Sequence, residues 1–335
     1  MDPQIASRFN ENILQAAIQR YAIAPDSIRL LDGFESYMYE FDRPEGQFIL
    51  RIGHSLRRSP DLVRGEVHWI NYLADGGATP APAVLSPHGN LVELVDDGQG
   101  GQFLCTAFVK ARGGIAKREQ INERLFHSYG RLVGRMHALA KNYRLPDPAW
   151  KRPEWDDPQN MCVEKRLPAR FNTVLERYLP LKQYLFALPK DPSSYGMIHQ
   201  DAHLANLFVD EDYHLTLFDF DDCVYGHFIY DIAMVWFYAS MWGKDDPGGF
   251  TAHFMPVFLS AYREENRLDP HWLAEMPHFL KLREIDLFAQ IHHGFTDGDH
   301  PDDPWSARYM QGRQERIENG VPYIAFNWET LAPYL

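Results

Sequence analysis

The chain has 335 residues, of which 45% are hydrophobic and 14% aromatic, and this composition excludes a disordered protein. Its formal charge of −13, from 33 basic and 46 acidic residues, argues against nucleic acid as a partner, because phosphate backbones bind clustered cations. A chain of this length exceeds one ordinary hydrophobic core and favours two lobes.

Cysteine use and the N-terminus indicate the compartment. The three cysteines, Cys105, Cys162 and Cys223, form no Cys-x-x-Cys pair, which is typical of reduced thiols in a cytoplasmic protein. The N-terminal sequence MDPQ is polar and has no signal-peptide pattern. The most apolar run, residues 228–242, is shorter than the ~20 residues that span a bilayer. We therefore expect a cytoplasmic protein that does not use a membrane.

The first hundred residues predict a small antiparallel sheet with one main helix. Apolar residues at helical spacing indicate an N-terminal helix over 4–21. Short apolar runs separated by turn residues indicate a three-stranded meander over 28–52. Ser-Pro at the start and Gly-Gly at the end bound a helix over 59–74. Further strands are expected over 84–85, 90–95 and 102–109.

One carboxylate, Glu66, falls within the apolar stripe of that helix, between Val63 and Ile70. A carboxylate on a buried face is costly unless it is paired. From the helix alone, two interpretations stay open: a buried ion pair, or a position on the edge of the stripe that reaches water.

Beyond residue 113 the chain is mostly helical. Apolar periodicity predicts helices over 121–142, 170–188, 234–242, 250–262 and 272–293. The stretch over 145–168 is rich in Pro, Asp and Trp and is expected to be irregular but packed, because aromatic residues need burial.

The segment over 197–231 contains the residues with the clearest chemistry. A strand over 204–209, a turn, and a second strand over 214–218 bring Asp201, Asn206 and Asp219 near one another. Two carboxylates and an amide form an oxygen-rich site, and Mg²⁺ prefers oxygen ligands. The sequence therefore predicts a magnesium site here.

Phosphoryl transfer explains why each residue type is present. The reaction needs Mg²⁺ to bridge nucleotide phosphates and a carboxylate to orient the acceptor hydroxyl and accept its proton. We expect Asp201 to be this base, and Asn206 and Asp219 to hold the metal. The spacing from His199 to Asn206 matches the kinase catalytic loop H-R-D-x-x-x-x-N, and the later Asp-Phe-Asp stands in place of Asp-Phe-Gly.

With H-x-D-x-H-x-x-N followed by LFDFDD and G-x-x-x-Y-D, the chain resembles the aminoglycoside phosphotransferase and choline kinase group of the protein-kinase-like superfamily. The resemblance extends over most of the chain, although its motifs in the first hundred residues are degenerate. It implies a two-lobed α+β fold. The expected parts are an N-lobe over 1–107, a hinge over 108–112 and a helical C-lobe over 113–335, with the catalytic loop over 197–222.

The resemblance also implies site residues in the N-lobe. Ser36 lies in the turn expected to cover the phosphates, although that turn has a single glycine. Arg51 stands where the family carries the strand cation that pairs the α- and β-phosphates and a helix carboxylate, here Glu66. An ordinary hairpin turn and an exposed strand arginine are the alternatives for Ser36 and Arg51. The adenine is expected at the hinge residues Phe108, Val109 and Lys110.

In the C-lobe, His203 stands where protein kinases place a lysine that faces the γ-phosphate. A hydrogen-bonded core histidine is the alternative for His203. His199 and Asp231 are expected to brace the catalytic loop rather than take part in the chemistry.

The leading prediction is therefore a kinase that uses ATP and Mg²⁺ to phosphorylate a hydroxyl group, most simply of a small molecule such as an aminoglycoside, choline or homoserine. A protein acceptor, as for protein kinases, and a non-catalytic kinase-fold binding protein are alternatives. A metal-dependent hydrolase is a third, with His199, Asp201 and His203 and the His- and Asp-rich stretch over 292–303 as ligands. The hydrolase interpretation leaves Asn206 and Asp219 unexplained.

Overall fold

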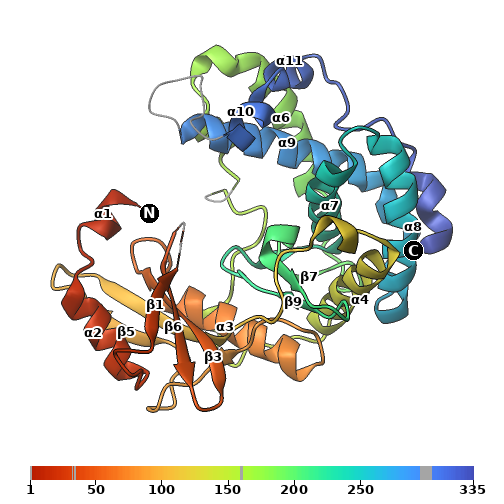
Figure 1. The fold of residues 1–335 in the computed structure, drawn as a ribbon. Helices are drawn as coiled ribbons and strands as arrows, with labels where there is room; N and C mark the ends of the chain where they lie inside the picture. Colours follow the sequence, from red (N-terminus) through yellow and green to blue (C-terminus); the bar gives the residue numbers. More distant parts are fainter. Residues whose placement is uncertain (1, 32, 34, 159–160, 295–303) are drawn as a thin grey trace. The chain divides into compact units, whose positions relative to one another are not determined.

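The computed structural model describes all residues except 1, 32, 34, 159–160 and 295–303 (Figure 1). Its architecture is α+β, as predicted, with an antiparallel sheet in the N-terminal region and a helical C-terminal region. The chain forms two compact units: the first contains residues 1–117, 142–152 and 205–223, and the second 118–141, 153–204 and 224–335. The expected hinge, 108–112, lies within the first unit, and the lobe boundaries stay a prediction.

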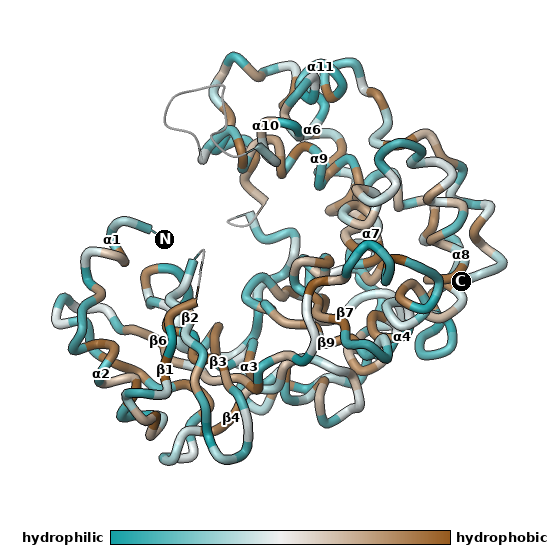
Figure 2. Tube along the Cα trace, in the orientation of Figure 1, coloured by the Kyte–Doolittle hydropathy of each residue, from teal (hydrophilic) through white to brown (hydrophobic). Residues whose placement is uncertain are grey.

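The first unit is built on an antiparallel sheet with the strand order β1-β2-β3-β6-β4, in which β5 also pairs with β6. Its inward side chains alternate with outward ones, and those of Phe41, Leu50 and Phe103 are fully buried. In Figure 2 the strands contain brown, hydrophobic stretches, whereas the connecting loops are largely teal. The strands are β1 (Ile28–Leu31), β2 (Tyr37–Arg43), β3 (Gly46–His54), β4 (Ala83–Val84), β5 (Glu93–Asp96) and β6 (Gln102–Val109).

The main helix of this unit, α3 (Pro60–Asp75), begins and ends as predicted. The Ser59 hydroxyl accepts a hydrogen bond from the N–H of Leu62 (3.2 Å), and Gly76 follows the last turn. Its buried face includes Glu66, which is 0% exposed, together with Val67 and neighbouring apolar residues. The helix therefore presents a carboxylate to the interior of the unit.

The single helix expected over 4–21 is instead two helices, α1 (Pro3–Ala6) and α2 (Glu11–Arg20). Asn10 separates them, because its backbone is extended and its side chain accepts hydrogen bonds from the N–H groups two and three residues later (3.0 and 3.3 Å). An asparagine that satisfies these N–H groups begins a new helix.

The segment over 205–223 forms a hairpin that belongs to the first unit. The strand expected over 204–209 begins late, because η4 (Leu204–Asn206) is a short 3₁₀ helix that precedes β8 (Leu207–Val209). β8 pairs with β9 (Leu215–Leu217). Leu217 also bonds the chain that follows α3, since its carbonyl accepts from Ala81 (2.9 Å) and its N–H donates to Thr79 (3.0 Å). The hairpin is thus held against the first unit.

The second unit consists mainly of helices around the pair of α4 and α8. At Gly130 of α4 a Cβ atom would lie 2.1 Å from the carbonyl oxygen of Phe258, so this close approach requires glycine. A short antiparallel pair, β7 (Tyr195–Ile198) and β10 (Val224–His227), precedes the buried helix α7 (Phe228–Ala239). The other helices are α4 (Glu123–Ala140), α5 (Val163–Arg166), α6 (Asn172–Phe186), α8 (Pro247–Glu265), α9 (Met276–His293), α10 (Pro304–Met310) and α11 (Arg313–Glu318).

Within the described residues, none of the helices combines the length and the apolar character needed to cross a bilayer.

Candidate active site

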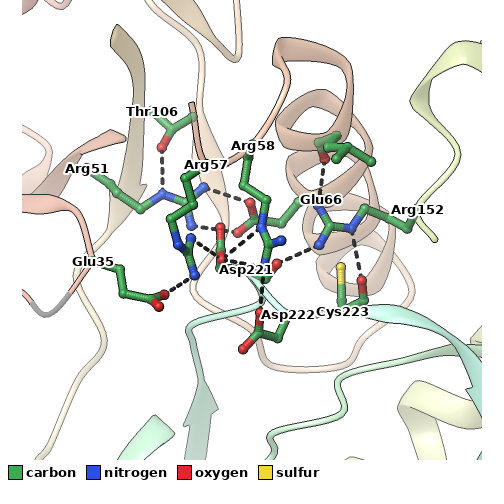
Figure 3. A network of polar contacts seen from close by, with 11 residues as sticks. Glu35, Arg51, Arg57, Arg58, Glu66, Thr106, Arg152, Asp221, Asp222 and Cys223 are labelled. Atoms are coloured by element: carbon green, nitrogen blue, oxygen red, sulfur yellow. Dashed lines mark hydrogen bonds and ion pairs between the residues drawn. The ribbon is translucent and has the colours of Figure 1, made fainter. Parts of the chain in front are cut away.

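Arg51 of β3 and Glu66 of α3 form a buried two-point ion pair (Figure 3). Nη1 lies 2.7 Å from Oε1 and Nη2 lies 2.8 Å from Oε2, while Nε donates to the hydroxyl of Thr106 on β6 (3.3 Å). Burial disfavours the charge of Arg51, but Glu66, Asp221 and Asp219 together raise its pKa. The structure therefore pairs Glu66 rather than exposing it, and Arg51 is not an exposed strand arginine. Its contact with nucleotide stays a prediction.

A second ionic network, which sequence reasoning missed, lies beside this pair (Figure 3). Arg57 and Arg58 follow β3, and both contact the Asp221 carboxylate; Arg58 Nε lies 3.2 Å from its Oδ2. Arg57 also binds Glu35 in the expected phosphate turn, and Arg58 binds Asp222 (2.6 Å). The signal was available, because a pair of arginines stands directly before the capping Ser59.

Asp221 is the centre of this network. Burial opposes its ionisation, but the charges of the surrounding arginines, with that of Arg58 the largest, lower the pKa of its carboxyl to about 2. The buried guanidinium of Arg152 also holds the segment, because it donates to the backbone carbonyls of Cys223 (2.9 Å) and Leu62 (3.1 Å). Among the residues that line one pocket here are Ser36, Arg51, Gly53, Arg57, Arg58 and Asp221.

The two expected metal ligands lie at the open end of the β8–β9 hairpin. Leu207 pairs with Leu217, and the N–H of Phe218 donates to the carbonyl of Asn206 (3.0 Å), so Asn206 and Asp219 leave the same end of the ladder. Asp219 has a φ of +61°, a left-handed conformation that aspartate tolerates better than most residues. An amide oxygen and a carboxylate in these positions fit a hard divalent cation.

The expected base, Asp201, lies in the second unit, and the chain passes into the first unit between Leu204 and Ala205. The predicted convergence of Asp201 with Asn206 and Asp219 therefore stays a prediction. Asp201 follows β7 on a tight turn in which Gln200 has a φ of +68°.

Asp231 of α7 braces this turn from inside the second unit. Its carboxylate accepts hydrogen bonds from the N–H groups of His199 (3.1 Å) and Gln200 (2.8 Å), and it contacts Nε2 of His137 (3.1 Å). Asp231 is 0% exposed. These contacts satisfy a buried carboxylate and hold the backbone before Asp201, and the assignment of Asp231 as structural stays a prediction. His199 is equally buried, and its Nδ1 accepts from the N–H of Asp201 (3.3 Å).

A guanidinium and an imidazole contact the Asp201 carboxylate. Nη2 of Arg283, on α9, lies 3.3 Å from Oδ1, and Nε2 of His203 lies 3.3 Å from Oδ2. Burial raises the pKa of this carboxyl, but the hydrogen bond to His203 and the charges of Arg283, His203 and His199 lower it to about 2. Asp201 is therefore ionised at neutral pH. The contact of His203 with nucleotide stays a prediction.

Two backbone N–H groups of the expected hinge residues form hydrogen bonds within the first unit. The N–H of Val109 donates to the carbonyl of Pro82 (2.9 Å), and the N–H of Lys110 donates to that of Gln47 (3.0 Å). The guanidinium of Arg51 lies over the ring of Phe108, 5.1 Å from its centroid. The adenine contact stays a prediction. Because these two N–H groups already donate to carbonyls, we expect other backbone groups to bind the adenine.

The hydrolase interpretation finds no further support. Within the described residues no three His, Cys, Asp or Glu side chains are placed to hold a metal ion. Two of the ligands proposed for it, Asp299 and His300, lie outside the described residues, as does most of the stretch over 292–303.

Residues 27–275 match the sequence model of the phosphotransferase enzyme family. The chain belongs to this family. It is similar to the amicoumacin kinase of Bacillus subtilis (strain 168), with 38% identity over 328 residues that cover 96% of each chain.

Solved structures of kinases are also similar to this chain. The amicoumacin kinase hAmiN, in complex with AMP-PNP, Ca²⁺ and Ami, has a TM-score of 0.93 at 33% identity and covers 99% of this chain and 100% of its own. A microcompartment-associated aminopropanol kinase shares the fold, with a TM-score of 0.71 at 24% identity over 93% of this chain and 98% of its own. This protein is therefore a phosphotransferase, and the hydrolase interpretation is not favoured.

Proposed function

We propose that this phosphotransferase moves the γ-phosphate of ATP, with Mg²⁺, to a hydroxyl group of amicoumacin or a close chemical relative. The similarity to amicoumacin kinases over almost the whole of both chains carries the proposal. Family membership alone would leave aminoglycosides, choline and amino alcohols as equal candidates. The relative's complex with AMP-PNP and Ca²⁺ supports a nucleoside triphosphate and a divalent cation as the other participants.

The reaction breaks the bond between the γ-phosphorus and the β,γ-bridging oxygen, and forms a bond from the acceptor oxygen to the γ-phosphorus. The hydroxyl proton passes to a carboxylate oxygen of Asp201. A carboxylate with a pKa of about 2 is a weak base. It suits a loose transition state, in which positioning of the hydroxyl matters more than early removal of its proton.

Arg51 has the position and the charge to bind nucleotide phosphates while Glu66 holds its guanidinium in place. Ser36 lines the same pocket and offers a hydroxyl donor. Asn206 and Asp219 would hold the cation. When bound, the cation would supply positive charge that offsets the charge of the phosphates. We favour Mg²⁺ because two protein ligands leave positions for phosphate oxygens and water, as magnesium sites do.

We also place the reaction in the cytoplasm. The free cysteines of the described chain, two of them buried, support a reducing compartment.

The first experiment is thermal unfolding with ATP, with and without Mg²⁺. A ligand at a hundred times its Kd adds about 2.7 kcal/mol of stability. We expect a rise in Tm that needs both ATP and Mg²⁺. If no nucleotide raises the Tm, the proposal is wrong.

The second experiment assigns the acceptor. ADP release is measured with amicoumacin, 1-amino-2-propanol, choline, homoserine and an aminoglycoside as separate acceptors. We expect the highest kcat/KM for amicoumacin. A higher kcat/KM for another acceptor would keep the kinase and replace the substrate.

A further inference from the structure

Arg283 is a largely buried cation that no motif in the sequence singled out. It lies on α9, and its side chain is 14% exposed. Nη2 contacts Oδ1 of Asp201 (3.3 Å) and also donates to the hydroxyl of Tyr238, while Nη1 contacts Oδ2 of Asp286 (3.4 Å). Its Nε is buried and has no hydrogen-bond partner among the described residues.

A guanidinium in this position is not required for packing. Removing charges from water costs several kcal/mol, and well-packed apolar residues often serve a buried site equally well. The neighbours of Arg283 on α9, such as Leu282 and Ile285, are fully buried. An arginine here, with one donor unsatisfied, therefore points to a role for its charge and its planar donor geometry.

Other groups of the second unit hold Arg283 in place. Asp286 binds it, and Asp286 is in turn bound by Arg166 of α5 (2.9 Å) and by Gln290 (2.6 Å). The guanidinium also lies over the ring of Tyr238, 5.5 Å from its centroid. A guanidinium held at several points is a fixed reference for the group that it contacts.

On the proposed function, we propose that Arg283 is a positioning residue for phosphoryl transfer. It binds Oδ1 of Asp201 while His203 contacts Oδ2, and together they fix the plane of the carboxylate that receives the hydroxyl proton.

The electrostatics of the carboxylate agree with this role. Among the described residues, the groups that face Asp201 include His199 and His203 on its own segment, Arg283 on α9, Tyr238 on α7 and Tyr129 on α4. Arg283 is the arginine among them. Without the charge of Arg283, burial weighs more, and the pKa of the Asp201 carboxyl rises. The acidic limb of the rate profile then moves to higher pH.

The experiment compares Arg283→Met and Arg283→Lys with wild type, using the acceptor that wild type phosphorylates. We expect Arg283→Met to lower kcat about 10- to 100-fold, the scale expected for a misplaced catalytic group, with the KM for ATP nearly unchanged. Its acidic limb moves to higher pH. Arg283→Lys restores the charge but not the planar donors, so it should recover part of kcat and most of the pH profile.

Lys281→Met is the matched control. Lys281 also lies on α9 and pairs with the buried Glu284, but it does not contact Asp201, and Glu284 keeps Arg313 as a partner (2.6 Å). This variant removes a cation from the same helix, so its kcat and pH profile should match wild type.

A double-mutant cycle with Asp201→Asn tests whether Arg283 acts through Asp201. If it does, Asp201→Asn/Arg283→Met is no slower than Asp201→Asn alone. Multiplied losses, or a wild-type kcat and pH profile in Arg283→Met, would overturn the inference. If Arg283→Met fails to fold, Arg283→Lys is compared with wild type by the same two measurements, kcat and the pH dependence of the rate. A wild-type enzyme that phosphorylates no acceptor would instead count against the proposed function.

Discussion

Arg51 and Glu66 face each other through two parallel hydrogen bonds of 2.7 and 2.8 Å, so each end of the ion pair uses two atoms (Figure 3). Such two-point pairs fix orientation as well as distance. The pair links β3 to α3 and neutralises two charges in the interior of the first unit.

The two ends of this pair should respond differently to substitution. Arg51→Met leaves the fully buried Glu66 without its cation, and breaking a buried pair in this way costs about 3–5 kcal/mol. Glu66→Gln should cost less, because Thr106, Asp219 and Asp221 still surround Arg51. Urea unfolding of both variants measures the difference. Equal losses would show that the remaining carboxylates do not compensate Arg51.

Asp201→Asn should remove proton acceptance and preserve the shape of the side chain. We expect kcat to fall by about 10²- to 10⁴-fold, the usual contribution of a positioned general base. The rise in Tm with ATP and Mg²⁺ should remain near that of wild type. Transfer at the wild-type rate would show that Asp201 is not the base.

Asp219→Ala should weaken the binding of ATP with Mg²⁺ more than the binding of ATP alone. Without this carboxylate the protein loses a proposed cation ligand, so the Kd for ATP with Mg²⁺ should rise more than the Kd for ATP with EDTA. Calorimetric titrations under the two conditions measure this ratio. A ratio equal to that of wild type would place the cation elsewhere.

Arg57→Ala should loosen the connection between the expected phosphate turn and the Asp221 segment. Arg57 contacts both Glu35 and Asp221, so its loss should raise the KM for ATP several-fold and cost about 1–3 kcal/mol of stability. Arg64→Ala is the control, because Arg64 pairs with Asp61 on the surface and should change stability by less than about 0.5 kcal/mol. The same KM for ATP and the same stability in both variants would show that the network does not affect ATP binding.

Stability should fall as the pH drops from about 6.5 to 4. Burial lowers the pKa of His227 to about 4, and burial also lowers the pKa values of His68 and His137. Below the ordinary histidine pKa of about 6.5 the unfolded chain binds protons that the folded chain refuses, so acid favours unfolding. For His227 the loss is on the order of 3 kcal/mol.

His227→Phe checks this account of the pH dependence. It keeps an aromatic ring but removes the titration and the contact with the carbonyl of Pro189 (3.2 Å). Its urea-unfolding free energy should change less between pH 6.5 and 4 than that of wild type. The same pH dependence as wild type would assign the effect to other groups.

The sequence by itself determined much of the fold and the chemistry. Periodicity and caps placed α3, the β2–β3 ladder and α4 within a few residues, because these signals act within one or two turns of chain. The fixed spacing of the catalytic-loop motif indicated Asp201 and Asn206 as candidate site residues. Glu66 was recognisable because a carboxylate inside an apolar stripe requires a partner.

Local patterns were less informative where a single side chain decides between two local structures. The cap at Asn10 begins a second helix after the first has ended at Ala6, and η4 delays the start of the strand expected over 204–209. In both places the apolar spacing continues across the break, so periodicity alone shows one element.

Only the tertiary structure decided which cations meet the functional carboxylates. Arg57 reaches Asp221 across 164 residues of sequence, and Arg283 reaches Asp201 across 82. Such partners are chosen by how strands and helices pack after folding, and an arginine has no spacing rule that reveals a distant partner. The motif therefore indicates the groups that we propose for the chemistry, whereas packing selected the groups that contact them.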